Sequence, residues 1–310
     1  MEQGQIVHKD RKRPKKKQNK RPVIYTFYQL KRVESTQFDF RNKKHHEDLL
    51  ETWQQLWKRA GWEPRVLTLK DAQRHPDYEK YSRALVKSPN MTNVYQGGYD
   101  HLCFIRWLAM ATVPKGGWMS DYDTIPMGIT VEMGLDLPNN GEFTSYAMHV
   151  PALLSGTHSE WERMAQNIMT TALQPHKYGE QQDPSPPQFY SDMYALLKIQ
   201  RTTPEAFHRG IPSYSPHENL VKDYPYKSPE TIDCPNLEKQ GILAAHLSHS
   251  ATTRAIRNGD LFIPKKYNHM YRDLFAKRVY RLWREQCHPK DDVILGHPSR
   301  NNVGGTLSTQ

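Results

Sequence analysis

Residues 116–127 carry the side chains of this chain that are best suited to chemistry. The segment is Gly-Gly-Trp-Met-Ser-Asp-Tyr-Asp-Thr-Ile-Pro-Met, so Asp121 and Asp123 follow a short apolar run after a glycine pair. Side chains alternate along a strand, which would place the two carboxylates on one side and Tyr122 on the other. Hard divalent cations prefer such oxygen ligands. The segment therefore predicts a Mg²⁺ or Mn²⁺ site that lies against a substrate diphosphate.

A further ligand is expected downstream, because two carboxylates rarely complete a metal site. His246 and His249 follow the apolar run at 242–245, and either histidine could serve. Only one of them can point inward from an extended segment, and His246, nearest the strand end, is the preferred candidate. Ser248 and Arg254 open the next helix, where backbone N–H groups and a positive charge could receive a phosphate.

A strand, a helix and a second strand precede this site. Residues 23–28 are β-branched and aromatic, residues 46–60 repeat apolar side chains at helical spacing up to Gly61, and residues 65–69 return to a strand pattern. This βαβ opening predicts a parallel sheet with helices on its faces. The next helix spans about 102–109, and a short strand at 118–120 delivers the aspartates at its carboxyl end, where open α/β sheets bind ligands.

The later elements are less regular. We expect a strand at 143–150 and then a helix that begins with a Thr157–Glu160 capping box. Ser191 is expected to cap a helix to about Ile199, and residues 201–240 are predicted to form a long loop over the site. A last amphipathic helix covers about 271–282.

Composition and charge indicate a single α/β domain with polar ends. The formal charge is +10, and residues 1–22 alone account for +7 of it. We divide the chain into a disordered basic arm (1–21), one domain (22–287) and a polar tail (288–310). A mixed sheet flanked by helices is the expected fold class.

The three cysteines, Cys103, Cys234 and Cys287, show no paired spacing. Neither a zinc site nor a disulfide framework is expected, which favours a reducing compartment. No stretch is apolar enough for a membrane span, and the N-terminus lacks a signal-peptide core. We expect a cytoplasmic location, with the Golgi lumen as the alternative if an N-terminal anchor is missing.

The site resembles that of a known enzyme family. Arg106 lies in a helix, Gly116-Gly117 follow ten residues later, and a hydrophobic strand leads to Asp121 and Asp123. This arrangement resembles the DXD-containing, sugar-binding-region glycosyltransferases of the GT-A fold, relatives of fungal mannosyltransferases. The likeness spans about residues 22–126. It departs from the family pattern at Cys103, where an Asp is usual, and Asp100 is the nearest acid.

The resemblance implies transfer of a hexose from a nucleotide-sugar donor with Mn²⁺ or Mg²⁺. Asp123 would bind the metal directly, while Asp121 would contact the ribose and reach the metal through water. Arg106 would lie near the donor sugar or steady Asp121. Asp100 and the glycines 116 and 117 would approach the donor. The acceptor, a glycan, lipid or protein, would be recognised by the loops within 175–240.

Asp192 is the candidate general base for the transfer. Asp192 lies at a helix start after a proline-rich turn, and a carboxylate facing an acceptor hydroxyl could take its proton. A first-turn Asp also stabilises a helix dipole, and this structural role is the favoured interpretation of Asp192.

Two other functions compete with glycosyl transfer. The run 121–125 also matches the loop of haloacid-dehalogenase-type phosphatases, although Asp291-Asp292 in the tail would then have to supply the late acidic pair. An RNA-binding protein could use the basic arm with Tyr and Trp as stacking surfaces. No nucleic-acid motif accompanies the arm, so a nucleic-acid partner is not expected.

Overall fold

A computed structural model describes residues 20–29, 43–88, 98–174, 191–211, 219–223, 225–228, 230–259 and 272–288. Nearly all of the expected basic arm and polar tail lies outside these residues, as do Asp291 and Asp292. None of the helices in the described part of the chain has the length and apolar character that a membrane span needs.

A six-stranded mixed sheet forms the centre of the fold. Its strands, in spatial order, are β2 (Glu63–Leu67), β1 (Val23–Phe27), β3 (Gly117–Ser120), β6 (Leu153–Gly156), β5 (Thr144–Ser145) and β7 (His208–Arg209). Strand β1 is parallel to both β2 and β3, as the βαβ opening predicts, whereas β6 is antiparallel to β3 and β5. The predicted fold class, a mixed sheet flanked by helices, is confirmed.

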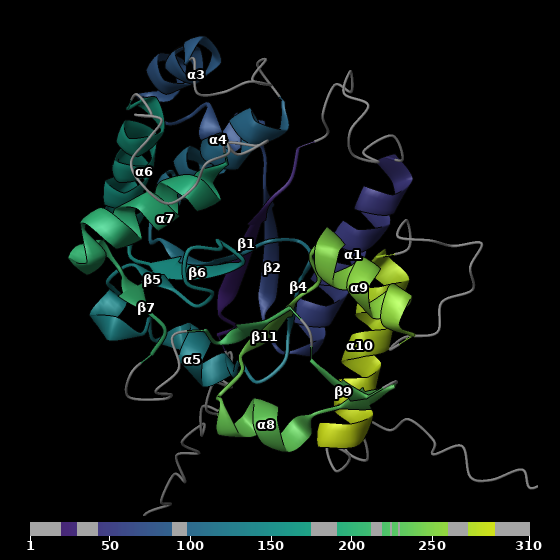
Figure 1. Cartoon of the computed structure of the whole chain (residues 1–310). Helices are drawn as coiled ribbons and strands as arrows, with labels where there is room; N and C mark the ends of the chain where they lie inside the picture. Colours follow the sequence, from purple (N-terminus) through teal and green to yellow (C-terminus); the bar gives the residue numbers. More distant parts are fainter. Residues whose placement is uncertain are drawn as a thin grey trace, which may run out of the picture.

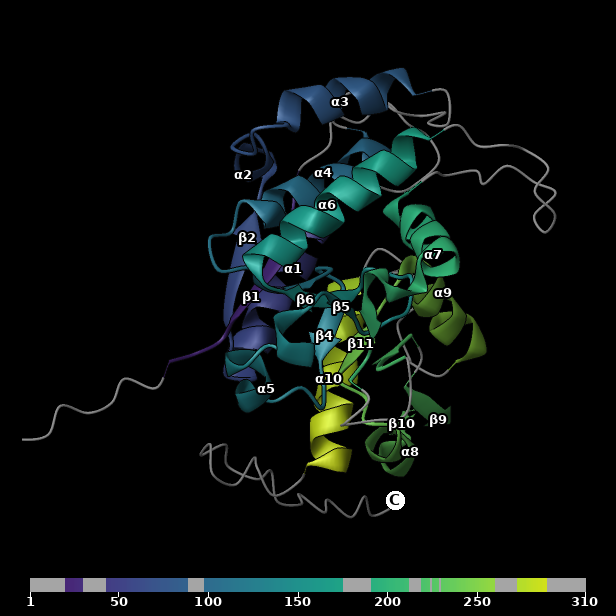
Figure 2. The ribbon, with the colours of Figure 1, turned by 90° about the vertical axis from the view of Figure 1, so that its left-hand side faces the viewer.

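Helices cover both faces of this sheet (Figures 1 and 2). One face carries α4 (Tyr99–Ala111), α6 (His158–Leu173) and α7 (Asp192–Thr202). The other face carries α1 (Lys43–Arg59), and α10 (Arg272–Cys287) packs against α1. The predicted helices at 46–60, 102–109 and 271–282 correspond to α1, α4 and α10.

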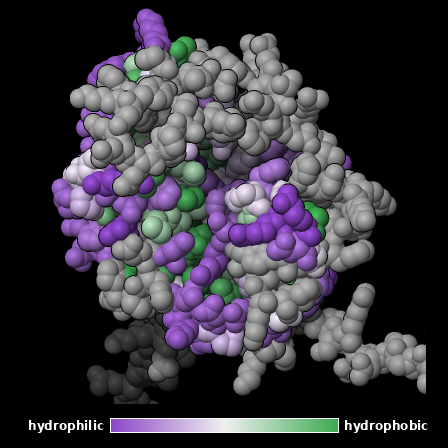
Figure 3. All heavy atoms as spheres, in the orientation of Figure 1, coloured by the Kyte–Doolittle hydropathy of each residue, from purple (hydrophilic) through white to green (hydrophobic). Residues whose placement is uncertain are grey.

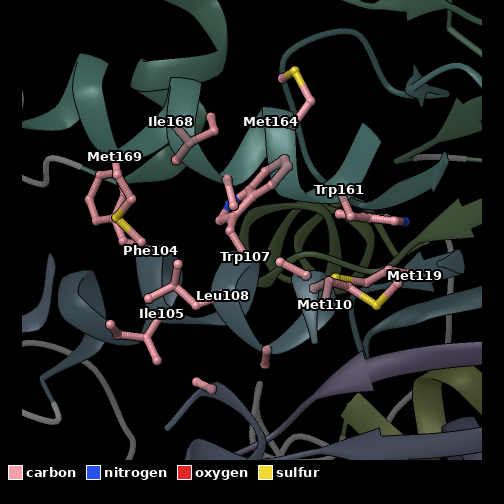
Figure 4. Packing of buried hydrophobic residues seen from close by; sticks show 14 of the residues in the cluster. Phe104, Ile105, Trp107, Leu108, Met110, Met119, Trp161, Met164, Ile168 and Met169 are labelled. Atoms are coloured by element: carbon pink, nitrogen blue, oxygen red, sulfur yellow. The ribbon is translucent and has the colours of Figure 1, made fainter. Parts of the chain in front are cut away.

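Strand alternation divides the core between the two helical layers. Tyr25, Met119 and Leu154 belong to the cluster with α4 and α6, whereas their neighbours Ile24, Trp118 and Leu153 join α1. Figure 4 shows the first cluster, in which Trp107 of α4 meets Trp161 of α6, with ring centroids 5.7 Å apart. Burial of large aromatic side chains on both faces fixes the sheet between rigid layers.

A second, smaller sheet was not expected from the sequence. It consists of β4 (Thr124–Pro126), β11 (Ala244–His246) and β8 (Val221–Lys222), with β11 antiparallel to β4 and parallel to β8. Because β4 follows β3 after only three residues, the chain passes from one sheet to the other at Asp121–Asp123. The predicted metal site thus lies at the junction of two sheets.

The remaining described elements are short and lie around these sheets. They are α2 (Leu69–Ala72), α3 (Tyr78–Lys87), α5 (Val131–Leu135), α8 (Cys234–Lys239), α9 (His249–Asn258), β9 (Tyr226–Ser228), β10 (Thr231–Ile232) and two 3₁₀ turns, Asn139–Gly141 and Pro204–Ala206.

Three local expectations were wrong. The strand expected at 143–150 is only β5, because the chain turns at Met148, whose φ is 57°. The Thr157 side chain makes no capping hydrogen bond, and Glu160 instead accepts from the backbone N–H of Phe143 at 2.8 Å. Residues 201–240 are not one loop, since they contain α8 and several short strands.

Cys234 and Cys287 form a disulfide, with their Cα atoms 5.4 Å apart. This bond links the start of α8 to the last residue of α10. The expectation of no disulfide was therefore wrong, because cysteines 53 residues apart in the sequence show no local spacing signal. Cys103 is buried in α4 and takes no part in a disulfide.

Candidate functional site

The two aspartates lie in a tight turn, which corrects the expectation that they extend a strand. Strand β3 ends at Ser120, and the N–H of Thr124 donates to the carbonyl of Asp121 at 2.9 Å. This i to i+3 bond closes a turn of four residues. The turn, rather than strand alternation, brings the two carboxylates together.

Neighbouring elements hold this turn on both sides. The indole N–H of Trp53 donates to the hydroxyl of Ser120 at 2.9 Å, and the indole of Trp57 donates to the carbonyl of Thr124 at 3.1 Å. The N–H of Asp121 donates to the carbonyl of Ala152 at 3.1 Å. Helix α1 and the segment before β6 therefore fix the backbone that carries both carboxylates.

Asp121 is paired with Arg106 of α4. The Arg106 guanidinium donates to Oδ1 of Asp121 and also, from Nε and Nη2, to Oδ2 of Asp192 at 2.7 and 2.6 Å. The indole N–H of Trp107 donates to the same Asp192 oxygen at 2.7 Å. Asp192 is almost fully buried, so its carboxylate serves to hold Arg106 against Asp121.

Asp123 is paired with Arg272, the first residue of α10. The Arg272 guanidinium donates to Oδ2 of Asp123 and to the carbonyl of Leu247, the latter at 2.6 Å from Nη2. The N–H of Leu247 donates in turn to the backbone carbonyl of Asp123 at 2.8 Å. The end of β11 and the start of α10 thus meet at Asp123.

His246 completes a group of three metal-competent side chains. Ligand atoms of Asp121, Asp123 and His246 all lie within 4.8 Å of one another. Nε2 of His246 is 3.5 Å from Oδ1 of Asp123, and Nδ1 is 3.1 Å from a carboxylate oxygen of Asp223, which follows β8. A carboxylate on the far nitrogen is the usual partner of a metal-binding histidine, because it fixes the ring orientation and the tautomer.

One buried atom also fits a cation. Oδ1 of Asp123 is shielded from solvent and accepts no hydrogen bond from the described residues, although Oδ2 is occupied by Arg272. A cationic neighbour of this oxygen is the imidazole of His246, whose Nε2 is 3.5 Å away, and a cation bound between these two atoms would satisfy the buried oxygen. The residues present therefore fit a divalent cation held by oxygen and imidazole ligands.

The surrounding charges shift the pKa values of Asp121 and Asp123 in opposite directions. Burial raises the pKa of Asp121 above its ordinary value, and Arg106 offsets this only in part because Asp123 and Asp192 add negative charge. Burial alone would also raise the pKa of Asp123, but the charges of His246 and Arg272 hold it below its ordinary value. Asp123 and its neighbours in turn raise the pKa of His246 to about 10, against the opposing effect of burial.

Tyr122 faces away from the carboxylates. Its hydroxyl is 3.0 Å from Nδ1 of His46, and its ring packs edge-on against Tyr28, with centroids 5.6 Å apart. Burial raises the pKa of Tyr28 to about 12. The side chain between the two aspartates therefore anchors the turn to the ends of β1 and α1.

The structure does not bring every predicted residue to this group. Gly116 and Gly117 lie at the opposite, amino end of β3, where a Cβ on Gly116 would come within 2.4 Å of the Gly156 carbonyl. Asp100 is buried in the first turn of α4. His249 is exposed at the start of α9, which is capped by Ser248 through the N–H of Ala251 at 3.1 Å, and Arg254 is exposed on the same helix.

Sequence reasoning missed Arg272 and Asp223. Arg272 stands in a helix rich in basic residues, so nothing in its spacing distinguishes it from the solvent-facing arginines nearby. Asp223 follows a strand of only two residues, which no periodicity reveals.

Figure 3 shows the molecule hollowed between α7 and α9, with apolar residues at the bottom of the hollow.

Comparisons with known proteins add one finding. A family model described as Domain of unknown function (DUF8765) matches residues 8–219, which is more than half of the chain. The chain belongs to this family. The DUF8765 match includes Arg106, Asp121, Asp123 and Asp192 but ends before His246 and Arg272. No curated protein and no solved structure matches the chain.

Proposed function

We propose that this protein is a metal-dependent glycosyltransferase that moves a hexose from a nucleotide-sugar donor to a glycan, lipid or protein acceptor. The observation that carries the proposal is the group of Asp121, Asp123 and His246, whose ligand atoms lie within 4.8 Å at the carboxyl end of β3. Its resemblance to the DXD glycosyltransferases gives the reaction class. The turn between two sheets supplies the rigid backbone that such a site needs.

Asp123 and His246 would hold Mn²⁺ or Mg²⁺ directly, with Oδ1 of Asp123, which accepts no hydrogen bond from the described residues, as one ligand atom. The cation would neutralise the negative charge that develops on the donor diphosphate as the glycosidic bond breaks. Asp121 would receive the donor ribose, and Arg106 would keep that carboxylate in place. His246 lies on a strand, Arg106 lies on a helix, and the turn that carries both aspartates is hydrogen-bonded to neighbouring elements, which limits the movement of these groups during reaction.

Asp192 is better suited to positioning than to proton transfer. Its Oδ2 accepts hydrogen bonds from Trp107 and from two nitrogens of Arg106. A general base needs an oxygen that can approach the acceptor hydroxyl. The base role expected for Asp192 stays untested, and the contacts support a role in holding Arg106.

We also favour the luminal location over the cytoplasmic one. The Cys234–Cys287 disulfide supports this choice, because structural disulfides persist in oxidising compartments and are rare in the cytosol.

The test is hydrolysis and transfer of UDP- and GDP-hexoses by the purified chain with Mn²⁺. Asp121→Asn and Asp123→Asn should each lower turnover about a thousandfold without loss of fold. Asp136→Asn, at the end of α5 and outside the group, should retain turnover. Activity near the wild-type level in either site variant would contradict the proposal. Phosphomonoester hydrolysis that depends on Asp121 would favour the phosphatase alternative instead.

A further inference from the structure

Arg272 is the residue of the site for which the proposed function gives no role. Its guanidinium lies on Oδ2 of Asp123 and is also bound to the Leu247 carbonyl, at 2.6 Å from Nη2 and 3.2 Å from Nε. Its side chain is only 15% exposed. A charge fixed by three hydrogen bonds next to a metal ligand affects whatever binds there.

The charge balance of the site shows what this effect is. Asp123 is neutralised by Arg272 before any cation arrives, and Asp121 shares Arg106 with Asp192. Two guanidinium groups face the three carboxylates of Asp121, Asp123 and Asp192, so with His246 neutral a divalent cation leaves these buried groups with one excess positive charge. Asp223 beside His246 is largely exposed and offsets this excess only in part. A diphosphate would remove that excess, because its negative oxygens can contact both the cation and the guanidinium.

We propose that Arg272 couples cation binding to diphosphate binding: it weakens the site for the cation alone and strengthens it for the cation together with a diphosphate. The inference rests on the metal site of the proposed function. Two ligands that each compensate the other's charge bind cooperatively, and the coupling is reciprocal. Such a site would remain largely empty of cation until a donor arrives.

The direction in which Mn²⁺ affinity changes when the Arg272 side chain is removed separates this role from a merely structural one. If Arg272 only held Asp123 in position, its removal would loosen the ligand and weaken Mn²⁺ binding. If it repels the cation, its removal strengthens Mn²⁺ binding. We expect Arg272→Gln to bind Mn²⁺ alone about tenfold more tightly than the wild type, which is the order expected for loss of one partly screened charge.

The experiment is a titration of the full chain with MnCl₂, in which free Mn²⁺ is measured by electron paramagnetic resonance. Arg272→Lys keeps the charge and should bind Mn²⁺ as the wild type does. Arg278→Gln is the matched control, because Arg278 lies on the same helix and pairs with Glu230 instead. Melting curves of each variant verify that it is folded.

A second readout measures the coupling itself. Mn²⁺ and inorganic pyrophosphate together should raise the melting temperature of the wild type by more than the sum of their separate effects, and Arg272→Gln should lose most of this excess.

Equal or weaker Mn²⁺ binding by Arg272→Gln would overturn the inference, as would an undiminished excess in that variant or no excess in the wild type. Absence of Mn²⁺ binding in every variant would refute the metal site itself. Because no sugar is transferred in either assay, failure of glycosyl transfer alone leaves the inference standing.

Discussion

Asp121 and Asp123 are separated by one residue, yet different parts of the chain hold them. Asp121 is held by Arg106, which Asp192 holds in turn, and all three residues lie within the DUF8765 match at residues 8–219. Asp123 is held by His246 and Arg272, which lie beyond it. Burial keeps the pKa of Asp121 above its ordinary value, whereas the two cationic neighbours hold that of Asp123 below it.

This difference indicates that the two sides of the site have different roles. His246 stands beside Asp123 as a second ligand, and Oδ1 of Asp123 accepts no hydrogen bond from the described residues, so the side of the site built by β11 and α10 is the better metal holder even though Arg272 repels a cation there. The side built by α4 and α7 is a buried ion-pair chain, which is suited to fixing geometry. The two sides meet at one turn, where ligand atoms of Asp121, Asp123 and His246 lie within 4.8 Å of one another.

The largest expected effect separates the two aspartates. Asp123→Asn and Asp121→Asn should each lower donor turnover about a thousandfold, because both remove charge from the reacting site. Only Asp123→Asn should also lower Mn²⁺ affinity strongly, about a hundredfold. Turnover assays and Mn²⁺ titrations of the two variants check this prediction. Equal loss of Mn²⁺ affinity in both variants would contradict the proposed difference between the two sides of the site.

Removal of the disulfide tests how far the side of the site built by β11 and α10 depends on this covalent bond. Cys234→Ser should lower the free energy of unfolding by about 3 kcal/mol, because the bond closes a long loop in the unfolded chain. Arg272 lies at the opposite end of α10, so Mn²⁺ affinity should change less than about twofold. Urea denaturation measures the first quantity. A large loss of Mn²⁺ affinity would show that the two ends of α10 are coupled.

Asp192→Asn probes the other side of the site. It should lower the free energy of unfolding by about 2 kcal/mol, because Arg106 and Trp107 lose a buried charged acceptor. Mn²⁺ affinity should remain at the wild-type value. Asp273→Asn is the matched control, because Asp273 is also a buried first-turn residue and, among the residues that the structure describes, it pairs only with the half-exposed Lys277. This variant should cost less than about 1 kcal/mol.

The smallest expected effect is a dependence of stability on pH through His246. Its pKa is raised to about 10, so in metal-free protein its stabilising contribution is complete below its unfolded value of about 6.5 and is lost as the pH rises toward 10. In EDTA, the stability advantage of the wild type over His246→Gln should therefore shrink between about pH 6.5 and 9.5, by on the order of 1 kcal/mol. An advantage that grows with pH would contradict the ion pair with Asp123.

The sequence predicted the parts of the fold that depend on long periodic segments. Helix α1 and strands β1 and β2 follow from apolar spacing and from Gly61, whose φ of 88° ends the helix as predicted. The small sheet of β4, β11 and β8 was missed because its strands have two or three residues each, too few to show a period.

The site was predictable only where its residues are close in sequence. Asp121, Asp123 and Arg106 form a local pattern, and His246 was chosen over His249 because it stands at a strand end, where the structure places it. Arg272 and Asp223 reach the site through tertiary packing alone. The same holds for Cys234 and Cys287, which only the packing of α8 against α10 brings together.

A crystal structure of the chain soaked with MnCl₂ tests the central claim most directly, because anomalous scattering locates Mn²⁺. The account predicts a peak about 2.1–2.4 Å from Oδ1 of Asp123 and Nε2 of His246, within reach of Asp121. A peak elsewhere, with these atoms engaged only by protein groups, would contradict it.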